Sequence, residues 1–151
     1  NDALAGQPLP GDLADYAPGF NENNLLIINI ESVPAVENLD RILDVPGIDS
    51  VLIGPHDLSC NLGKPEQYDD PIFLETAETI FTKARAKGIG AGIHAWGDPA
   101  SQTRFVNMGA NLLIHKADII FFKNGIREEL TEILEKLGIQ PSDTATGEVN
   151  I

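Results

Sequence analysis

One pattern constrains the fold more than any other, because it repeats four times along the chain: an apolar run followed by apolar residues at helical spacing. The first run, residues 25–31, reads LLIINIE and is typical of a parallel strand that is buried on both faces. Similar runs occupy residues 48–54, 90–94 and 111–115. Strands that alternate with helices pair in parallel through right-handed crossovers. The sequence therefore predicts an α/β fold of four βα units.

Helix start and stop signals separate the apolar runs. Pro34 stands where a first helical turn accepts a residue without N–H, and the first helix is expected to continue from there to Pro46. Asp70-Pro71 predicts a second helix start after a loop, because an aspartate N-cap precedes a proline at the first helical position. Asp98-Pro99 repeats this signal for the third helix. A fourth helix carries the apolar residues Phe122, Ile126, Leu130, Ile133, Leu134 and Leu137.

The chain divides into three parts on composition. Residues 1–24 hold prolines and glycines among acids and amides and are expected to be irregular, residues 25–138 hold the four units, and residues 139–151 form a polar tail that we expect to be flexible. Four units form either a small open sheet or half of a (β/α)₈ barrel, whose full form needs about 250 residues. The length of 151 residues favours the open sheet unless the chain is a piece of a longer one.

Charge and cysteine content exclude several classes of protein. The chain has 23 acidic against 10 basic residues and a net charge of −13, which would repel a phosphate backbone, so no nucleic-acid partner is expected. The longest apolar runs have about five residues, whereas a membrane-spanning helix needs about 20, so no membrane span is expected. The single cysteine, Cys60, cannot form an internal disulfide, which suits a reducing cytoplasm. We therefore expect a cytoplasmic protein.

Two carboxylates follow neighbouring strands at their carboxyl ends, where α/β proteins gather their functional residues. Glu31 comes directly after the first apolar run, and Asp57 lies just beyond the second. A site that offers two carboxylates and leaves further coordination positions to other oxygens suits a hard divalent cation such as Mg²⁺ or Mn²⁺. The alternative is that Glu31 caps the following helix and Asp57 closes a turn, and spacing alone does not separate the two interpretations.

The stretches INIESVPAVENLDRIL at residues 28–43 and GIDSVLIGPHDLSCNLG at residues 47–63 resemble the C-terminal half of the HpcH/HpaI aldolases. These are class II pyruvate aldolases of the aldolase/citrate lyase superfamily, built on a (β/α)₈ barrel. The resemblance extends over residues 25–138, and its specificity lies in the order and separation of the I-E-S and I-G-P-H-D-L-S motifs. It implies the C-terminal half of a barrel and a divalent metal, Mg²⁺, Mn²⁺ or Co²⁺, held by Glu31 and Asp57.

The resemblance also implies a substrate site for pyruvate, or another 2-oxo acid. The segment Gly54-Pro55-His56-Asp57 would present backbone N–H groups to the pyruvate carboxylate, and Gly54 allows the close approach that this requires. Asn29 stands where many members carry Gln, and it either holds a water at the metal or fills the barrel interior.

His94 and Trp96 follow the third strand of the predicted sheet. They either line the pocket for the aldehyde, or serve the fold, with His94 bonded to backbone and Trp96 packed in the core. Lys116 stands at a rim position where relatives usually carry a small residue.

The implied reaction is the metal-dependent cleavage of a 4-hydroxy-2-oxo acid to pyruvate and an aldehyde, with a substrate of the 4-hydroxy-2-oxoheptanedioate or 2-dehydro-3-deoxyglucarate type. The metal acts as a Lewis acid that stabilises the enolate. The catalytic His and the substrate-binding Arg of the family lie on early strands, so both are expected upstream of Asn1. The isolated chain is therefore expected to be inactive.

Two alternatives to an aldolase remain at this stage. A citrate-lyase-type acyl-CoA lyase shares the barrel and the Glu/Asp pair, although Pro55 and the L-S after Asp57 favour the aldolases. A non-catalytic half barrel is the other alternative. Half a barrel leaves two sheet edges unpaired, so we expect the chain to self-associate as a homo-oligomer.

Overall fold

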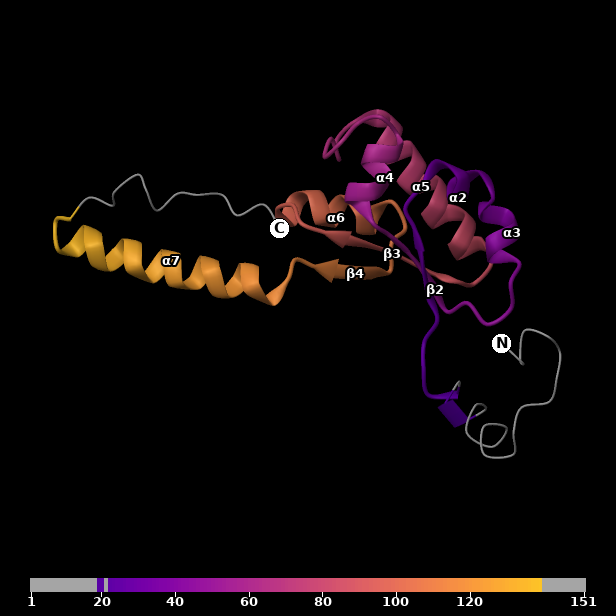
Figure 1. Cartoon of the computed structure of the whole chain (residues 1–151), viewed down its shortest axis with the longest axis horizontal. Coiled ribbons are helices and arrows are strands. Elements are labelled where there is room, and N and C mark those ends of the chain that lie inside the picture. Colours follow the sequence, from indigo (N-terminus) through magenta and orange to yellow (C-terminus); the bar gives the residue numbers. More distant parts are fainter. Residues whose placement is uncertain (1–18, 21, 140–151) are drawn as a thin grey trace. The chain divides into compact units, whose positions relative to one another are not determined.

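The computed structural model describes residues 19–20 and 22–139, and its strands form one sheet (Figure 1). The strand order is β1-β2-β3-β4, for β1 (Ile27–Ile30), β2 (Ser50–Ile53), β3 (Gly90–Ala95) and β4 (Leu112–His115). The strands are parallel, with Ile27 opposite Ser50 and Ser50 opposite Gly90. The predicted α/β fold of four parallel strands is confirmed. Most of the predicted irregular segment 1–24 and of the tail 139–151 lies outside the described residues.

The chain divides into two compact units, the first ending at Ile114 and the second beginning at His115. The first unit holds β1 to β3, the helices that precede β4 in the chain, and β4 as far as Ile114. The described part of the second unit is dominated by α7 (Asp118–Lys136), the predicted fourth helix. Among the residues described, no helix is long and apolar enough to cross a membrane.

The first helical segment differs from its prediction. It consists of two short helices, α2 (Val33–Glu37) and α3 (Leu39–Leu43), and not of one continuous helix. The break lies at Asn38, whose side-chain amide donates to the Pro34 carbonyl at 2.9 Å. A short amide side chain that bonds to backbone offers the chain an alternative to the regular helix, which explains the break.

A second correction concerns the segment after β2, which the sequence analysis assigned to a loop. It begins with a helix, α4 (Pro55–Asn61), that carries Asp57 in its first turn. Pro55 occupies the first turn, where its missing N–H costs nothing, and Leu58 is fully buried. The buried leucine anchors a helix too short to be stable by propensity alone.

The second and third helices begin where predicted. Asp70 caps α5 (Pro71–Ala86) by accepting from the Ile72 N–H at 3.0 Å, and Asp98 caps α6 (Pro99–Asn107) by accepting from the Ser101 N–H at 2.8 Å. Helix α5 contacts β2 and β3, and its predicted inward residues are all buried. These are Phe73, Ala77, Ile80, Phe81 and Ala84.

The two faces of the sheet differ in burial. Alternate residues of a strand point to opposite faces, and Ile30, Val51 and Ile53 are fully buried in the core that includes α5. On β1 the other alternating positions, Ile27 and Asn29, are exposed. One face of the sheet is thus covered by helices, as Figure 1 shows for α2, α3 and α5, whereas the other keeps exposed residues at the β1 edge.

The capping aspartates predict a dependence of stability on acid. The Lys64 ammonium and the Ile72 N–H hold the pKa of Asp70 below its ordinary value of 3.8, and the Ser101 N–H does the same for Asp98. A depressed pKa contributes stability that is present above the ordinary value and is lost as pH falls through the folded value. We expect the thermal unfolding temperature to decrease as the pH is lowered below about 4. This decrease should be smaller in the Asp98→Asn variant, because asparagine keeps the cap without titrating. The matched control is Glu75→Gln on α5, and equal acid profiles for the two variants would contradict this origin.

The exposed β1 edge predicts self-association. Strand β1 lies at one edge of the sheet, and the side chain of Ile27 on it is 39% exposed. Unpaired strand edges with apolar side chains readily pair with another chain. We expect the 16.3 kDa chain to sediment as a larger species at micromolar concentration, and Ile27→Lys to shift it toward monomer. Ile72→Lys on α5, where the isoleucine is 44% exposed, is the control. A stable monomer of the unaltered chain would show that its sheet edges tolerate solvent.

Candidate active site

Glu31 lies against the neighbouring strand end. It follows β1 directly, and the register that sets Ile30 opposite Ile53 brings it beside Gly54. A Cβ on Gly54 would lie 2.2 Å from Glu31 Oε1 and 2.7 Å from its Cδ. Any side chain at position 54 would therefore displace the carboxylate, which accounts for glycine there.

The capping role considered for Glu31 is taken by its neighbour. The Ser32 hydroxyl accepts from the Ala35 N–H at 3.3 Å and caps α2. The Glu31 carboxylate instead accepts from the side-chain amide of Asn29 at 3.0 Å. Asn29 and Glu31 thus form one polar pair at the carboxyl end of β1.

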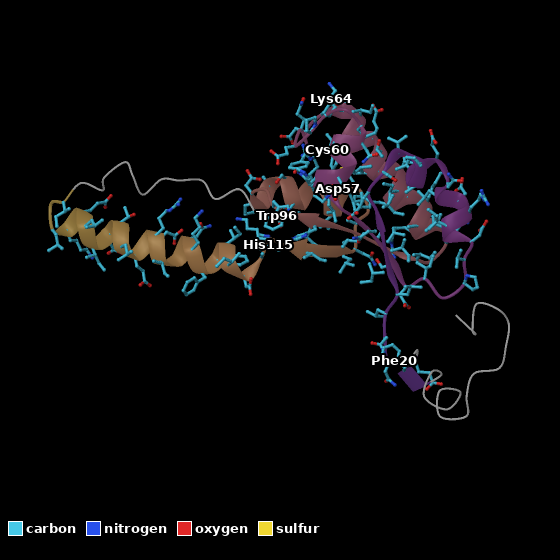
Figure 2. The ribbon with its side chains drawn as sticks, in the orientation of Figure 1. Phe20, Asp57, Cys60, Lys64, Trp96 and His115 are labelled. Carbon is cyan, nitrogen blue, oxygen red and sulfur yellow. The ribbon has the colours of Figure 1, made fainter. Side chains whose placement is uncertain are left out.

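Asp57 lies in the first turn of α4, and not in a turn between other elements. Its side chain is exposed, and its carbonyl accepts from the Asn61 amide at 3.1 Å. Figure 2 shows Asp57 on this helix, beyond the end of β2. The exposed carboxylate is therefore accessible to solutes at the same end of the sheet as Glu31.

Among residues 19–20 and 22–139, no three His, Cys, Asp or Glu side chains gather into a metal site. The pair Glu31 and Asp57 would provide two hard oxygen ligands, so further positions would fall to water or substrate oxygens. Mg²⁺ and Mn²⁺ accept this kind of ligand set. The donor chemistry of the pair therefore fits a hard divalent cation.

The side chain of His56 has two partners of its own. Its Nδ1 lies 3.4 Å from Glu66 Oε1, and its Nε2 lies 3.9 Å from Cys60 Sγ. The buried Ser59 connects the same parts, because its hydroxyl donates to the His56 carbonyl at 2.8 Å and accepts from the Glu66 N–H at 3.0 Å. These contacts hold the helix α4 that carries Asp57 to the loop that follows it.

His94 and Trp96 lie at a cavity of about 260 Å³ in the first unit. Their ring centroids are 4.5 Å apart, with an interplanar angle of 36°. Trp96 is 43% exposed, so the alternative of core packing does not describe it (Figure 2). The ring of Trp96 is therefore accessible to a ligand at this cavity, with His94 packed beside it.

The cavity wall also contains Tyr68, Asp69 and Arg104, which no sequence signal predicted. Asp69 accepts from Arg104 Nη2 across 35 positions of sequence. Burial, followed by the negative charge of Glu66, raises the pKa of Tyr68, so its hydroxyl stays protonated. These residues belong to no common short motif, and no sequence pattern marks Asp69 as separate in role from the capping Asp70 that follows it.

Several known proteins with similar sequences or structures are aldolases. A family model described as HpcH/HpaI aldolase/citrate lyase matches residues 12–118. The chain is 37% identical over 120 residues to 2-keto-3-deoxy-L-rhamnonate aldolase from Salmonella typhi, covering 80% of this chain and 45% of that protein.

Two solved structures share the fold. The HpcH/HpaI aldolase from Desulfitobacterium hafniense has a TM-score of 0.73 at 30% identity, covering 89% of this chain and 51% of that one. An HpcH/HpaI aldolase/citrate lyase family protein from Burkholderia cenocepacia has a TM-score of 0.71 at 26% identity, covering 82% and 46%.

The chain spans about half the length of the relatives it matches, and their similarity confirms the resemblance carried by the I-E-S and I-G-P-H-D-L-S motifs. The family match covers both motifs and all four strands of the sheet. On this evidence, the chain belongs to the HpcH/HpaI aldolase/citrate lyase family.

Proposed function

We propose that this chain supplies the metal and pyruvate half of a divalent-metal-dependent aldolase that cleaves 4-hydroxy-2-oxo acids to pyruvate and an aldehyde. The observation that carries the proposal is the close approach of the Glu31 carboxylate to Gly54. Gly54 belongs to the same I-G-P-H-D-L-S motif as Asp57. Glu31 and Asp57 would hold Mg²⁺, Mn²⁺ or Co²⁺. When bound, the cation supplies Lewis acidity for the negative charge that develops as the carbon–carbon bond breaks.

The backbone of residues 54–57 would bind the substrate carboxylate. This segment forms the start of α4, where N–H groups have no partner inside the helix. Gly54 also lacks a side chain that would keep a ligand away from the backbone. These donors would orient the 2-oxo acid beside Glu31 and Asp57.

Asn29 is a positioning residue in this proposal. Its amide donates to Glu31 Oε1 at 3.0 Å and so fixes the rotation of the carboxylate. In the cleavage itself, the bond between C3 and C4 of the substrate breaks, and its electron pair remains on C3 as the enolate of pyruvate. The C4 hydroxyl gives up its proton and becomes the aldehyde carbonyl. A general base accepts this proton, and protonation of the enolate at C3 completes pyruvate.

The carboxylate pair gives the first test of the proposal. We expect Mn²⁺ to bind the chain, and Glu31→Gln and Asp57→Asn each to lower the affinity about tenfold or more, because each variant loses a charged oxygen ligand. Electron paramagnetic resonance of free Mn²⁺ measures the affinity. Glu37→Gln on α2 is the matched control. Superimposable titrations for all four proteins would refute the site.

The same titration tests the role of Gly54. Gly54→Ala places a methyl group 2.2 Å from Glu31 Oε1, so the carboxylate must move and Mn²⁺ binding should weaken while the fold remains. Gly125→Ala is its control, since a Cβ there meets no atom within 4 Å.

Turnover by the chain alone is expected to be very low. The four arginines lie on helices α3, α5, α6 and α7, and none follows a strand end where a substrate-binding arginine would be placed. Pyruvate release from 4-hydroxy-2-oxoheptanedioate, measured with a coupled lactate dehydrogenase assay, should therefore not exceed that of metal alone. Rapid release by the purified chain would show that its own residues suffice for acid–base chemistry.

A further inference from the structure

Ser59 is a polar side chain in a fully buried position. It lies inside α4, where the other buried residues are Pro55 and Leu58. A buried hydroxyl needs hydrogen-bond partners, because burying it without them costs free energy. Ser59 has two such partners, and both belong to the backbone. These partners indicate what its hydroxyl does in the fold.

One partner is the peptide group that precedes Asp57. The Ser59 hydroxyl donates to the His56 carbonyl at 2.8 Å, and this carbonyl belongs to the peptide plane that joins His56 to Asp57. The plane on the other side of Asp57 is held as well, because its N–H, on Leu58, donates to the Gly54 carbonyl at 3.0 Å. Peptide groups are planar, so the two planes that flank a residue fix where its Cα–Cβ bond points. These bonds therefore set the direction in which the Asp57 side chain leaves the backbone.

The other partner belongs to the loop between α4 and α5. The Ser59 hydroxyl accepts from the Glu66 N–H at 3.0 Å. Glu66 has a φ of 59°, in the left-handed region that residues other than glycine rarely adopt. Such a conformation persists only where surrounding contacts hold it. The hydroxyl of Ser59 is one of the contacts that hold this loop in place.

The loop is in turn fixed to the start of α5. The Lys64 N–H donates to the Ser59 carbonyl at 2.9 Å, and the Lys64 ammonium lies 2.9 Å from Asp70 Oδ2. Asp70 caps α5, whose inward face is buried. The Ser59 hydroxyl thus connects the peptide group before Asp57 to a loop that is anchored on the helical layer of the first unit.

We propose that Ser59 is a positioning residue for the cation site: its hydroxyl orients Asp57 by holding the peptide group before it against the loop at Glu66. Ser59 acts through Asp57 and does not itself ligate the cation. This inference rests on the proposed function, because it takes Asp57 as a ligand. It adds that the charge of Asp57 is not sufficient, since the carboxylate must also project in the direction that the bonds between α4 and the loop impose.

Titration with Mn²⁺, followed by electron paramagnetic resonance of the free ion, tests the role of Ser59. We expect Ser59→Ala to weaken Mn²⁺ binding about tenfold, the lower end of the range for groups that orient a metal ligand. Ser50→Ala is the matched control and should leave the affinity unchanged. Ser50 is also buried, but its hydroxyl donates to the Val51 carbonyl at 3.1 Å, within β2. Circular dichroism checks that each variant is folded.

A double-mutant cycle separates positioning from a general loss of stability. If Ser59 acts through Asp57, adding Ser59→Ala to Asp57→Asn should lower Mn²⁺ affinity by at most about twofold further. Adding Ser59→Ala to Glu31→Gln should still lower it about tenfold, because Asp57 remains there to be misplaced. A weakened fold would instead reduce binding by the same factor in both backgrounds.

Two further variants identify the atoms responsible. Glu66→Gln keeps the N–H that donates to Ser59 and removes the charge beside His56, so Mn²⁺ affinity should stay within about twofold of the unaltered chain. A tenfold loss in Glu66→Gln would assign the effect to this charge and contradict the role of the hydroxyl. Ser59→Cys keeps a side chain of similar shape that donates and accepts only weakly, so it should also weaken binding. It decides the matter if Ser59→Ala does not fold.

Three results would overturn the proposal: Mn²⁺ binding by Ser59→Ala as tight as by the unaltered chain, an equal loss in Ser50→Ala, or a further tenfold loss when Ser59→Ala is added to Asp57→Asn. The outcome is separable from that of the metal site itself. Unaltered titrations in Glu31→Gln and Asp57→Asn would remove the metal site, and this proposal with it. Weaker binding in those two variants, with unaltered binding in Ser59→Ala, would leave the metal site and remove only the role of Ser59.

Discussion

The close approach of Glu31 to Gly54 is the contact on which the candidate site depends. Parallel pairing of β1 with β2 brings the two strand ends together, and the absence of a side chain at Gly54 lets the carboxylate lie over the neighbouring backbone. Asn29 then fixes one carboxylate oxygen. Gly54 is also the N-cap of α4, the helix that begins at Pro55 and carries Asp57 in its first turn. The absence of a side chain at Gly54 thus makes room for the Glu31 carboxylate, and the same residue precedes the helix that carries the Asp57 carboxylate.

The sequence predicted the elements whose signals are local. Asp70 and Asp98 are followed by proline, and an N-cap with a proline in the first turn has few other stable conformations, so both helix starts were predicted correctly. The buried strands were recognisable because both faces are apolar. The break at Asn38 and the helix after Gly54 were not predicted, since each depends on one bond or one buried side chain in a segment that also resembles a loop.

Candidate residues of the site could be predicted from the sequence only where they directly follow a strand. Glu31, Asp57, His94 and Trp96 became candidates because the carboxyl ends of parallel strands meet at one edge of the sheet. The pair Asp69 and Arg104 joins a loop to α6 across 35 positions, and no periodic pattern connects them. Their place in the same cavity wall depends on how α6 lies beside the end of β3, which only the structure shows.

Pro55 relates the two halves of the candidate site to each other. It is buried, it begins α4 two residues before Asp57, and it forms part of the wall of the cavity beside Trp96. A rigid residue at this place separates a polar region, where carboxylates suit a cation and amides suit an anionic substrate end, from a cavity that is apolar apart from a few charged groups.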